Sequence, residues 1–400
     1  MPEAVIVATA RSPFGKAGRG AMREVRPDDL TQLVIRAAVD RVPGLDGTMI
    51  DDIIVGCAMP QDEHGDNIAR RVAVQLGYPS PGVTVNRFCA SSVQTTRMAM
   101  HAIRAGEGRV FVSAGVDCVS RYRPNPEPDR NPRFAQALAR SAARHASNSL
   151  WADPMLDGEL PDVYIDMGET AENVAGLRGV SRERQDEYAL LSQQRAEAAK
   201  AAGFFNQEII PIPLADGSVI TADESPRSGA TLERMASLEP VFRAGGTVTA
   251  GNACPLNDGA AALVVMSDEA ARDLGAKPLA RIIATSTSSL SPEIMGLGPI
   301  EAIRKVLASS TMAISDIDLF EINEAFAAQV LPCLDDLSAP LDRVNVHGGA
   351  IAIGHPFGAT GARLIGTIIN GLQQRDATMG VVSMCVAGGQ GMALLLERMS

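Results

Sequence analysis

The chain has 400 residues, which exceeds the usual size of one hydrophobic core, so we expect two or more domains. Hydrophobic residues make up 46% and charged residues 21%, as in ordinary globular proteins, which excludes a disordered chain. The 47 acidic residues outnumber the 36 basic ones and leave a net charge of −11. This balance argues against a nucleic-acid-binding protein, because such proteins need basic patches that neutralise phosphates.

The cysteine and histidine content argues against a disulfide scaffold and against a structural metal site. The chain has six cysteines, none in a C-x-x-C pair, and five histidines. Its start, MPEAVIVATARS, lacks the basic and long apolar regions of a signal peptide. No apolar run reaches the roughly 18–20 residues needed to cross a bilayer. We therefore expect a cytoplasmic protein with free thiols, no membrane span and no bound metal.

Strands and helices are predicted to alternate along the N-terminal part of the chain. Apolar runs predict strands over residues 5–8, 53–55, 83–88 and 110–112. A helix is predicted over residues 91–105, ended by Gly106, and an earlier one from the spacing of Leu30, Leu33, Val34, Ala37 and Ala38. This alternation is typical of an α/β fold with mainly parallel sheets.

The C-terminal part repeats this order of segments. LARIIATSTS (279–288) matches AVIVATARS near the start, and SDIDLFEINEAF (315–326) matches IDDIIVGCAMP (50–60). VNVHGGAIAIGHP (344–356) leads into a helix as VNRFCASS (85–92) does, and GVVSMCVAGG (380–389) matches RVFVSAGVDC (109–118). Four matches in the same order indicate an internal duplication.

A polar segment separates the two copies. It begins at residues 121–134, where four prolines exclude a regular helix or a central strand. Up to about residue 249 we predict one clear helix, with Ser181 as its N-cap. We therefore expect a first half made of residues 1–120 and 250–270, an inserted loop or lid domain over 121–249, and a second half over 271–400.

Cys89 lies in VNRFCASSVQTT, where a predicted strand runs into a predicted helix. A thiol at a helix N-terminus meets backbone N–H groups and partial positive charge, both of which favour the thiolate. The alternative is a buried and inert cysteine, the usual state of a free thiol. Cys89 is thus a candidate nucleophile.

His355 lies in the glycine-rich segment HGGAIAIGHPFGATGAR (347–363), between a glycine and a proline. Glycines allow close backbone approach and the proline restricts the chain, so such a segment can present a rigid histidine to a ligand or a nucleophile. A phosphate-binding loop is disfavoured because neither G-x-G-x-x-G nor G-x-x-x-x-G-K-[ST] is present. A surface turn without function is the other alternative.

Two further candidates follow predicted strands in the second copy. Cys385 begins CVAGGQGMA, whose glycine-rich turn can point backbone N–H groups at an oxyanion. Asn323 begins NEAFAAQ and can orient a water or a carbonyl, unless it is only a helix N-cap. If the duplicated halves bring these loops together, two thiols and a histidine would suit acyl transfer.

The chain resembles the thiolase family over nearly its whole length. VNRFCASS looks like the nucleophilic-cysteine motif, and NEAFA, GGAIAIGHPFGATGAR and C-x-x-G-G-Q-G match the other three signatures in their usual order. Supporting segments are MGETAENVA (167–175), DESPRSGATLERM (223–235), TVTAGNACPLNDGAA (247–261) and MGLGPIEA (295–302). The resemblance implies two similar α/β halves layered αβαβα, with a loop domain inserted in the first.

The resemblance also implies an acyltransferase that acts on CoA thioesters in two steps. Cys89 would attack the acyl carbonyl with help from His355 and form an acyl-enzyme, and Cys385 would act as acid and base. The main expectation is thiolysis of a 3-ketoacyl-CoA in fatty-acid or related acyl-CoA degradation. The alternative is the biosynthetic condensation that forms acetoacetyl-CoA. The resemblance implies no permanently bound cofactor. It also implies that the protein forms a homodimer or a homotetramer.

Further site residues are implied only by this resemblance. One oxyanion hole would use His355 and a water held by Asn323, and the other the backbone N–H groups of Cys89 and Ala387. CoA would lie along the loop domain with Arg227 near its phosphates. Other substrate contacts would come from Met167, Cys254, Met295, Ala325 and Phe326.

Several positions depart from the commoner family pattern and leave the acyl-chain preference open: Ser92, Asp166, Cys254 and Ala387. Two other functions are weighed against thiolase activity. A decarboxylating ketosynthase is disfavoured because Asn323 and Cys385 stand where that class would present two histidines. A non-catalytic acyl-CoA or sterol-binding relative is disfavoured because binding needs neither thiol.

Overall fold

The computed structural model describes residues 1–123 and 129–399. Its main sheet contains β1 (Ala4–Arg11), β2 (Gly15–Lys16), β3 (Asp52–Gly56), β4 (Gly82–Val85), β5 (Val110–Cys118), β8 (Asn257–Ser267), β9 (Ala280–Ser289), β10 (Leu319–Ile322), β11 (Met379–Val386) and β12 (Gln390–Arg398). A separate hairpin is formed by β6 (Ile212–Pro213) and β7 (Val219–Ile220).

The α-helices are α1 (Pro27–Asp40), α2 (Ile68–Leu76), α3 (Ser91–Ala105), α4 (Ala135–Ser147), α5 (Met167–Arg178), α6 (Arg182–Ala201), α7 (Leu232–Ala236), α8 (Asp268–Leu274), α9 (Gly298–Ser309), α10 (Ala327–Leu337), α11 (Ala350–Ile353) and α12 (Phe357–Gln374).

The duplication predicted from the sequence is present in the strand order. In the first half, β1, β8, β5, β3 and β4 lie side by side, with β8 antiparallel to both neighbours and β3 parallel to both of its own. In the second half, β9, β12, β11 and β10 follow the same order with the same directions. A parallel bridge from Phe320 to Val344 stands where β4 stands in the first half. A short β1–β9 contact joins the two halves.

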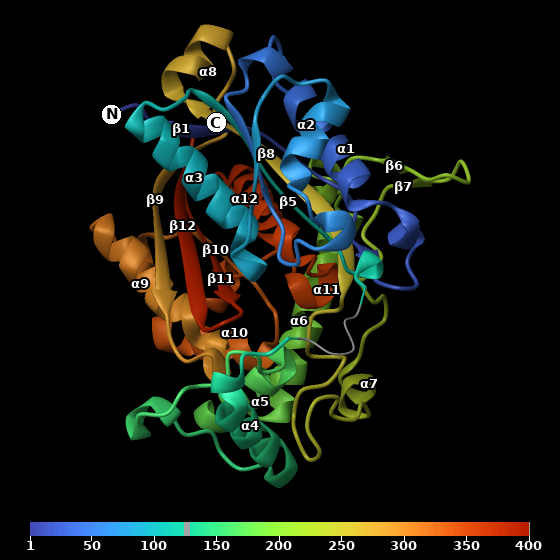
Figure 1. Cartoon of the computed structure of the whole chain (residues 1–400), viewed down its shortest axis with the longest axis vertical. Helices are drawn as coiled ribbons and strands as arrows, with labels where there is room; N and C mark the ends of the chain where they lie inside the picture. The colour runs from blue at the N-terminus through green and yellow to red at the C-terminus, as the bar shows by residue number, and fades with distance from the viewer. Residues whose placement is uncertain (124–128, 400) are drawn as a thin grey trace.

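The layers are α, β, α, β and α, as the resemblance implied. Helices α3 and α12 pack between the two half-sheets, and one hydrophobic cluster joins Val93 and Ile103 of α3 to Leu364 and Ile368 of α12 (Figure 1). Helices α1 and α2 cover the outer face of the first half-sheet. Helices α9 and α10 cover that of the second. The nearly continuous burial of β1, β5 and β8 explains why their sequences are apolar runs.

The segment between the halves contains more helix than the sequence predicts. The expected helix is α6, and the Ser181 side chain accepts the Arg184 N–H as its N-cap. Helices α4, α5 and α7 were missed: α5 has no apolar stripe, α7 has only five residues, and α4 buries only Ala137 and Arg144. Pro124, Pro126 and Pro128 of the proline-rich stretch lie outside the described residues. The three domain boundaries given above stay a prediction.

The start of α12 lies against the first half-sheet at backbone contact distance. A Cβ on Gly115 of β5 would stand 2.0 Å from the carbonyl oxygen of Gly358, and one on Gly361 would stand 2.7 Å from the backbone nitrogen of Val93. The Ser92 hydroxyl accepts the Ala362 N–H at 2.8 Å across the same contact. The two central helices, one from each half, therefore begin side by side.

We expect Gly115→Ala to lower the thermal unfolding midpoint, because its methyl group meets backbone that cannot rotate away, a strain typically of about 1–3 kcal/mol. Gly366→Ala is the matched control. Gly366 lies inside α12, and a Cβ at this position would meet no other atom closer than 3.5 Å. It should raise the midpoint slightly, because alanine favours a helix over glycine by roughly 0.5–1 kcal/mol. Equal midpoints for the two variants would contradict the close approach.

Candidate active site

Cys89 lies on a tight turn between β4 and α3. The strand ends at Val85, earlier than predicted, and a short 3₁₀ helix over Phe88–Ala90 carries the thiol. Phe88 has a φ of +44°, which is unusual for a bulky residue. Its N–H donates to the Asn86 side chain at 2.7 Å, and its carbonyl accepts the Ser91 hydroxyl at 2.6 Å. These bonds hold Cys89 at a fixed position before the helix.

The Cys89 thiol is not activated at rest, contrary to the expectation that the helix N-terminus would favour the thiolate. Burial raises its pKa to about 11. The backbone N–H groups of Ala387 and of Cys89 itself lie beside the sulfur and act in the opposite direction, while the negative charge of Asp117 raises the pKa further. Desolvation therefore exceeds the effect of the two donors.

Two further thiols accompany Cys89. Cys385, at the end of β11, is fully buried, and burial together with the Cys89 and Cys254 thiols raises its pKa well above the ordinary value. Burial and the neighbouring Cys89 likewise raise the pKa of Cys254. The described residues bring together no group of three histidine, cysteine or acidic side chains suited to a metal ion. The structure thus gathers three neutral thiols from separate parts of the chain.

His355 precedes α12 and is fixed on several sides. Gly354 before it has a φ of +116°, and a Cβ there would meet the Asn257 side chain at 2.6 Å. The Asn257 side chain accepts the His355 backbone N–H at 3.0 Å. The imidazole Nδ1 lies 2.7 Å from the Thr360 hydroxyl, and Nε2 lies 3.3 Å from the Asn323 side-chain nitrogen. The segment is therefore a rigid buried support rather than a surface turn.

Burial lowers the pKa of His355 to about 3, and the positive charge of Arg363 acts in the same direction. The imidazole is therefore neutral throughout the physiological range.

Asn323 follows β10 and is not a helix cap. Helix α10 begins at Ala327, and Phe326 occupies its N-cap position. The Asn323 N–H donates to the Ser383 carbonyl at 2.9 Å, so this residue and Cys385 leave the ends of neighbouring parallel strands. Its side-chain oxygen is buried and accepts no hydrogen bond from any described residue. That oxygen is available to a water or a substrate.

The four residues expected along the acyl channel pack together beside Cys385. Met295, Ala325 and Phe326 are buried in one cluster with this thiol, and Met167 is packed against it. The Cys254 N–H donates to the Ala325 carbonyl at 3.0 Å, which ties the Cys254 segment to the same cluster. The structure thus brings the predicted channel residues to one place.

Arg227 is not part of this cluster. It lines a cavity of about 190 Å³ with the residues that precede and form α7, and none of the catalytic candidates lines that cavity. Its guanidinium donates to the Ala250 carbonyl at 3.0 Å. Partial burial and the positive charge of Arg19 lower its pKa. Of the other departures from the family pattern, Ser92 links the two central helices, and Asp166 caps α5 by accepting the Gly168 N–H.

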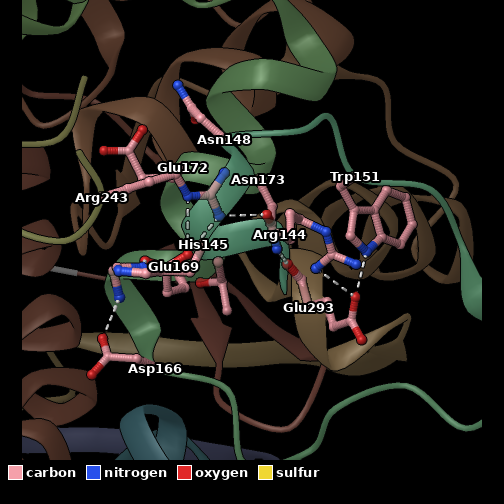
Figure 2. Close-up of polar contacts among 12 residues, drawn as sticks. Arg144, His145, Asn148, Trp151, Asp166, Glu169, Glu172, Asn173, Arg243 and Glu293 are labelled. Atoms are coloured by element: carbon pink, nitrogen blue, oxygen red, sulfur yellow. Dashed lines mark hydrogen bonds and ion pairs between the residues drawn. The ribbon is translucent and has the colours of Figure 1, made fainter. Parts of the chain in front are cut away.

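A buried polar network missed by sequence reasoning holds the segment around Met295. Glu293 is fully buried, and its carboxylate accepts the Trp151 indole N–H at 2.7 Å and the Asp162 N–H at 2.8 Å, and pairs with Arg144 at 3.1 Å. Its carbonyl accepts the Asn173 side chain at 3.0 Å (Figure 2). Glu293 is one acidic residue among 47, and only the long-range contacts distinguish it.

The alkylation of Cys89 by iodoacetamide should depend on pH as a neutral thiol does. Because the pKa of Cys89 is about 11, the thiolate fraction, and with it the rate, should rise about tenfold per pH unit from pH 7 to pH 10. The measurement is the rate of modification of the Cys89 peptide followed by mass spectrometry. A plateau below pH 8 would indicate a thiolate–imidazolium pair at rest and would contradict the pKa values of both residues.

Comparison with protein families gives two matches that together span the chain. Residues 4–269 match the thiolase N-terminal domain, and residues 276–398 match the thiolase C-terminal domain. A β-ketoadipyl-CoA thiolase from Acinetobacter baylyi is 42% identical over 408 aligned residues that cover 100% of both chains. A 3-ketoacyl-CoA thiolase from Cronobacter sakazakii is 41% identical and an acetyl-CoA acetyltransferase from Cupriavidus necator 40% identical, each with full coverage of both chains.

Solved structures agree with these matches. The dimeric peroxisomal thiolase of Saccharomyces cerevisiae superposes with a TM-score of 0.90 and 36% identity, covering 100% of this chain and 98% of that one. A human mitochondrial 3-ketoacyl-CoA thiolase in complex with CoA gives a TM-score of 0.86 and 33% identity, with coverage of 100% and 98%. The shared fold, the two family matches and the full-length relatives lead to one conclusion: this chain belongs to the thiolase family.

Proposed function

We propose that the chain is a thiolase that transfers an acyl group between a 3-ketoacyl-CoA and CoA through an acyl-enzyme on Cys89. The observation that carries this proposal is the placement of the Cys89 sulfur beside two backbone N–H groups and within the electrostatic reach of the buried Cys385 thiol. One thiol is then able to attack a carbonyl while a second thiol handles protons.

In the first step, the Cys89 sulfur bonds to the 3-keto carbon as its proton moves to His355. The bond between C2 and C3 then breaks, and C2 takes a proton from Cys385, which releases acetyl-CoA and leaves the shortened acyl group on Cys89. In the second step, the Cys385 thiolate takes the proton of the incoming CoA thiol. The CoA sulfur attacks the acyl carbon, the carbon–Cys89 bond breaks, and the Cys89 sulfur regains its proton from His355.

The N–H groups of Cys89 and Ala387 support an oxyanion hole for one of these steps. The oxygen of a carbonyl carbon bonded to the Cys89 sulfur lies within the reach of donors that already face that sulfur. One such donor typically contributes about 10²–10³ in rate. Replacement of the commoner glycine by Ala387 leaves its N–H in place. The unpartnered Asn323 oxygen supports a water in the second proposed hole, together with His355.

The proposed partners are CoA thioesters, seated between the Arg227 cavity and the channel formed by Met167, Cys254, Met295, Ala325 and Phe326. The CoA complex of the human relative supports a CoA site in this fold. No permanently bound cofactor enters the proposal. The dimeric yeast relative supports a homodimer or homotetramer, which sedimentation velocity tests directly. The described residues include no helix long and apolar enough to span a membrane. As a separate part of the proposal, we place the protein in the cytoplasm.

The same site supports condensation in the reverse direction, and one full-length relative is named as an acetyl-CoA acetyltransferase. In that direction Cys385 removes an α-proton from acetyl-CoA and the resulting carbanion attacks acetyl-Cys89. Thiolysis rates on a panel of straight, branched and dicarboxylic 3-ketoacyl-CoAs, compared with the rate of acetoacetyl-CoA synthesis, separate these alternatives.

Cys89→Ala should abolish thiolysis of 3-ketoacyl-CoA and the acyl-enzyme adduct together, because no other group forms the covalent bond; losses for a removed nucleophile are on the order of 10⁴-fold or more. Cys385→Ala should slow both acylation of Cys89 and the later attack of CoA, because each step moves a proton through Cys385, but it should still form the adduct at long times because the nucleophile is present. Cys254→Ser is the control and should retain the adduct. The measurements are the loss of substrate absorbance and the intact mass after substrate addition.

Thiolysis by Cys89→Ala at the wild-type rate would overturn the assignment of Cys89 as the nucleophile. Tight CoA binding by the wild-type protein without any adduct would instead favour a non-catalytic acyl-CoA or sterol-binding relative. Turnover of a malonyl thioester would favour the hypothesis that the protein is a decarboxylating ketosynthase.

A further inference from the structure

The catalytic role of a neutral histidine depends on which ring nitrogen carries the hydrogen. An imidazole with its hydrogen on Nε2 donates a hydrogen bond there, whereas one with its hydrogen on Nδ1 presents a lone pair at Nε2 and accepts a proton. His355 is fully buried, so this choice is set by its protein neighbours and not by bulk water. The contacts of its ring with Thr360 and Asn323 therefore determine which nitrogen carries the hydrogen.

The Thr360 hydroxyl is committed as a donor elsewhere. Thr360 is fully buried in the first turn of α12, and its Oγ1 donates to the Pro356 carbonyl one turn earlier at 2.8 Å. A hydroxyl has one hydrogen, so Oγ1 presents only lone pairs to the His355 Nδ1, which lies 2.7 Å away. A hydrogen bond at that distance requires the hydrogen on Nδ1.

The contact on the other side of the ring requires the same state. The side-chain nitrogen of Asn323, a donor only, faces Nε2 at 3.3 Å. Nε2 must therefore supply a lone pair. The two contacts come from different elements, the first turn of α12 and the end of β10, so they are independent observations.

We propose that Thr360 is a positioning residue that holds His355 in the Nδ1–H state, so that Nε2 accepts the Cys89 proton during acylation. The inference rests on the proposed thiolase function. The Cys89 S–H bond breaks, an Nε2–H bond forms, and the sulfur electron pair bonds to the substrate carbonyl carbon. The Nδ1–H keeps its bond to Thr360, the Asn323 amide turns its nitrogen away from the new Nε2–H, and the backbone N–H groups of Cys89 and Ala387 bind the new oxyanion. His355 is thus a proton acceptor first and a hydrogen-bond donor at Nε2 only afterwards.

The competing arrangement turns the Thr360 hydroxyl towards Nδ1 and places the hydrogen on Nε2. Nε2–H would then point at the Asn323 nitrogen, a clash of two donors, unless the Asn323 amide also rotates to present its oxygen. That second arrangement makes His355 an oxyanion donor from the start and deprives Cys89 of its base. The two arrangements differ in one observable hydrogen position.

Long-range ¹H–¹⁵N spectra of the histidine-labelled protein distinguish these states. An unprotonated Nε2 correlates with both carbon-bound ring hydrogens, whereas an unprotonated Nδ1 correlates strongly with only one. His355 is assigned by its absence in His355→Gln. We expect the unprotonated nitrogen to be Nε2 in the wild type, and the two states to mix in Thr360→Val, which has the same shape but no acceptor. Thr360→Ser should restore the wild-type spectrum.

The rate of Cys89 acylation by 3-ketoacyl-CoA gives the kinetic test. A general base contributes about 10²–10⁴ in rate, so partial loss of the correct state in Thr360→Val should slow acylation about tenfold or more. Thr360→Ser should recover most of this rate. Thr367→Val is the matched control, because the Thr367 hydroxyl is buried on the same helix and has no hydrogen-bond partner among the described residues. It should acylate like the wild type.

An Nε2–H resonance in the wild type, or equal acylation rates for Thr360→Val and Thr367→Val, would overturn the proposal. These outcomes are separable from failure of the proposed function. If the wild-type protein forms no acyl-enzyme, the thiolase proposal fails while the spectrum still reports the state of His355. If acylation occurs and the spectrum shows Nε2–H, the thiolase proposal stands and only the role of Thr360 is wrong.

Discussion

The contact between the first turns of the two central helices is the constraint on which the site depends. One helix begins just after Cys89 and the other just after His355, and they belong to different copies of the duplicated fold. Glycines at positions 115, 358 and 361 allow the backbones to approach without intervening side chains, and the Ser92 hydroxyl bonds across the contact. This approach places the turns that carry Cys89 and His355, the proposed nucleophile and base, beside each other.

Burial then sets the chemical state of the groups brought together. Both the thiol and the imidazole lose solvation, and the cost applies to the charged form of each. The pKa of Cys89 therefore rises while that of His355 falls, so the resting pair is neutral. Transfer of the proton must accompany bond formation to the substrate, because a separated ion pair is costly in this environment. A protonated thiol is also less reactive towards oxidants than a thiolate.

Much of the architecture was predictable from local pattern. Apolar runs gave the buried strands, and the repeated order of segments gave the duplication, because a strand buried on both faces leaves a clear trace in sequence. The helices of the inserted segment were harder to predict from the sequence, because α4 and α5 are stabilised by contacts with distant segments. The pairing of Arg243 with Glu169 of α5 joins residues 74 positions apart, which no local spacing reveals.

The candidate site shows the same division. Cys89, Asn323, His355 and Cys385 stand at strand ends or in glycine-rich turns, where residue type and context both point to chemistry. Thr360 and Glu293 carry no such mark. Their importance comes from the partners that each side chain contacts at specific distances, and the pKa shift of Cys89 even opposes what its helix position alone predicts. Local sequence indicates where a site is, whereas packing determines the state of its groups.

The duplicated fold has a consequence for how the machinery is divided. The two copies share one strand order, yet the first contains the proposed nucleophile, Cys89, and the second contains His355, Asn323 and Cys385, for which we propose the other roles. In this proposal each copy contributes a different part of the chemistry. A fragment that contains one half would hold an incomplete set of reacting groups however well it folded, and the two fragments together would be needed to reconstitute turnover. Catalysis in this protein therefore depends on the contact between its two halves.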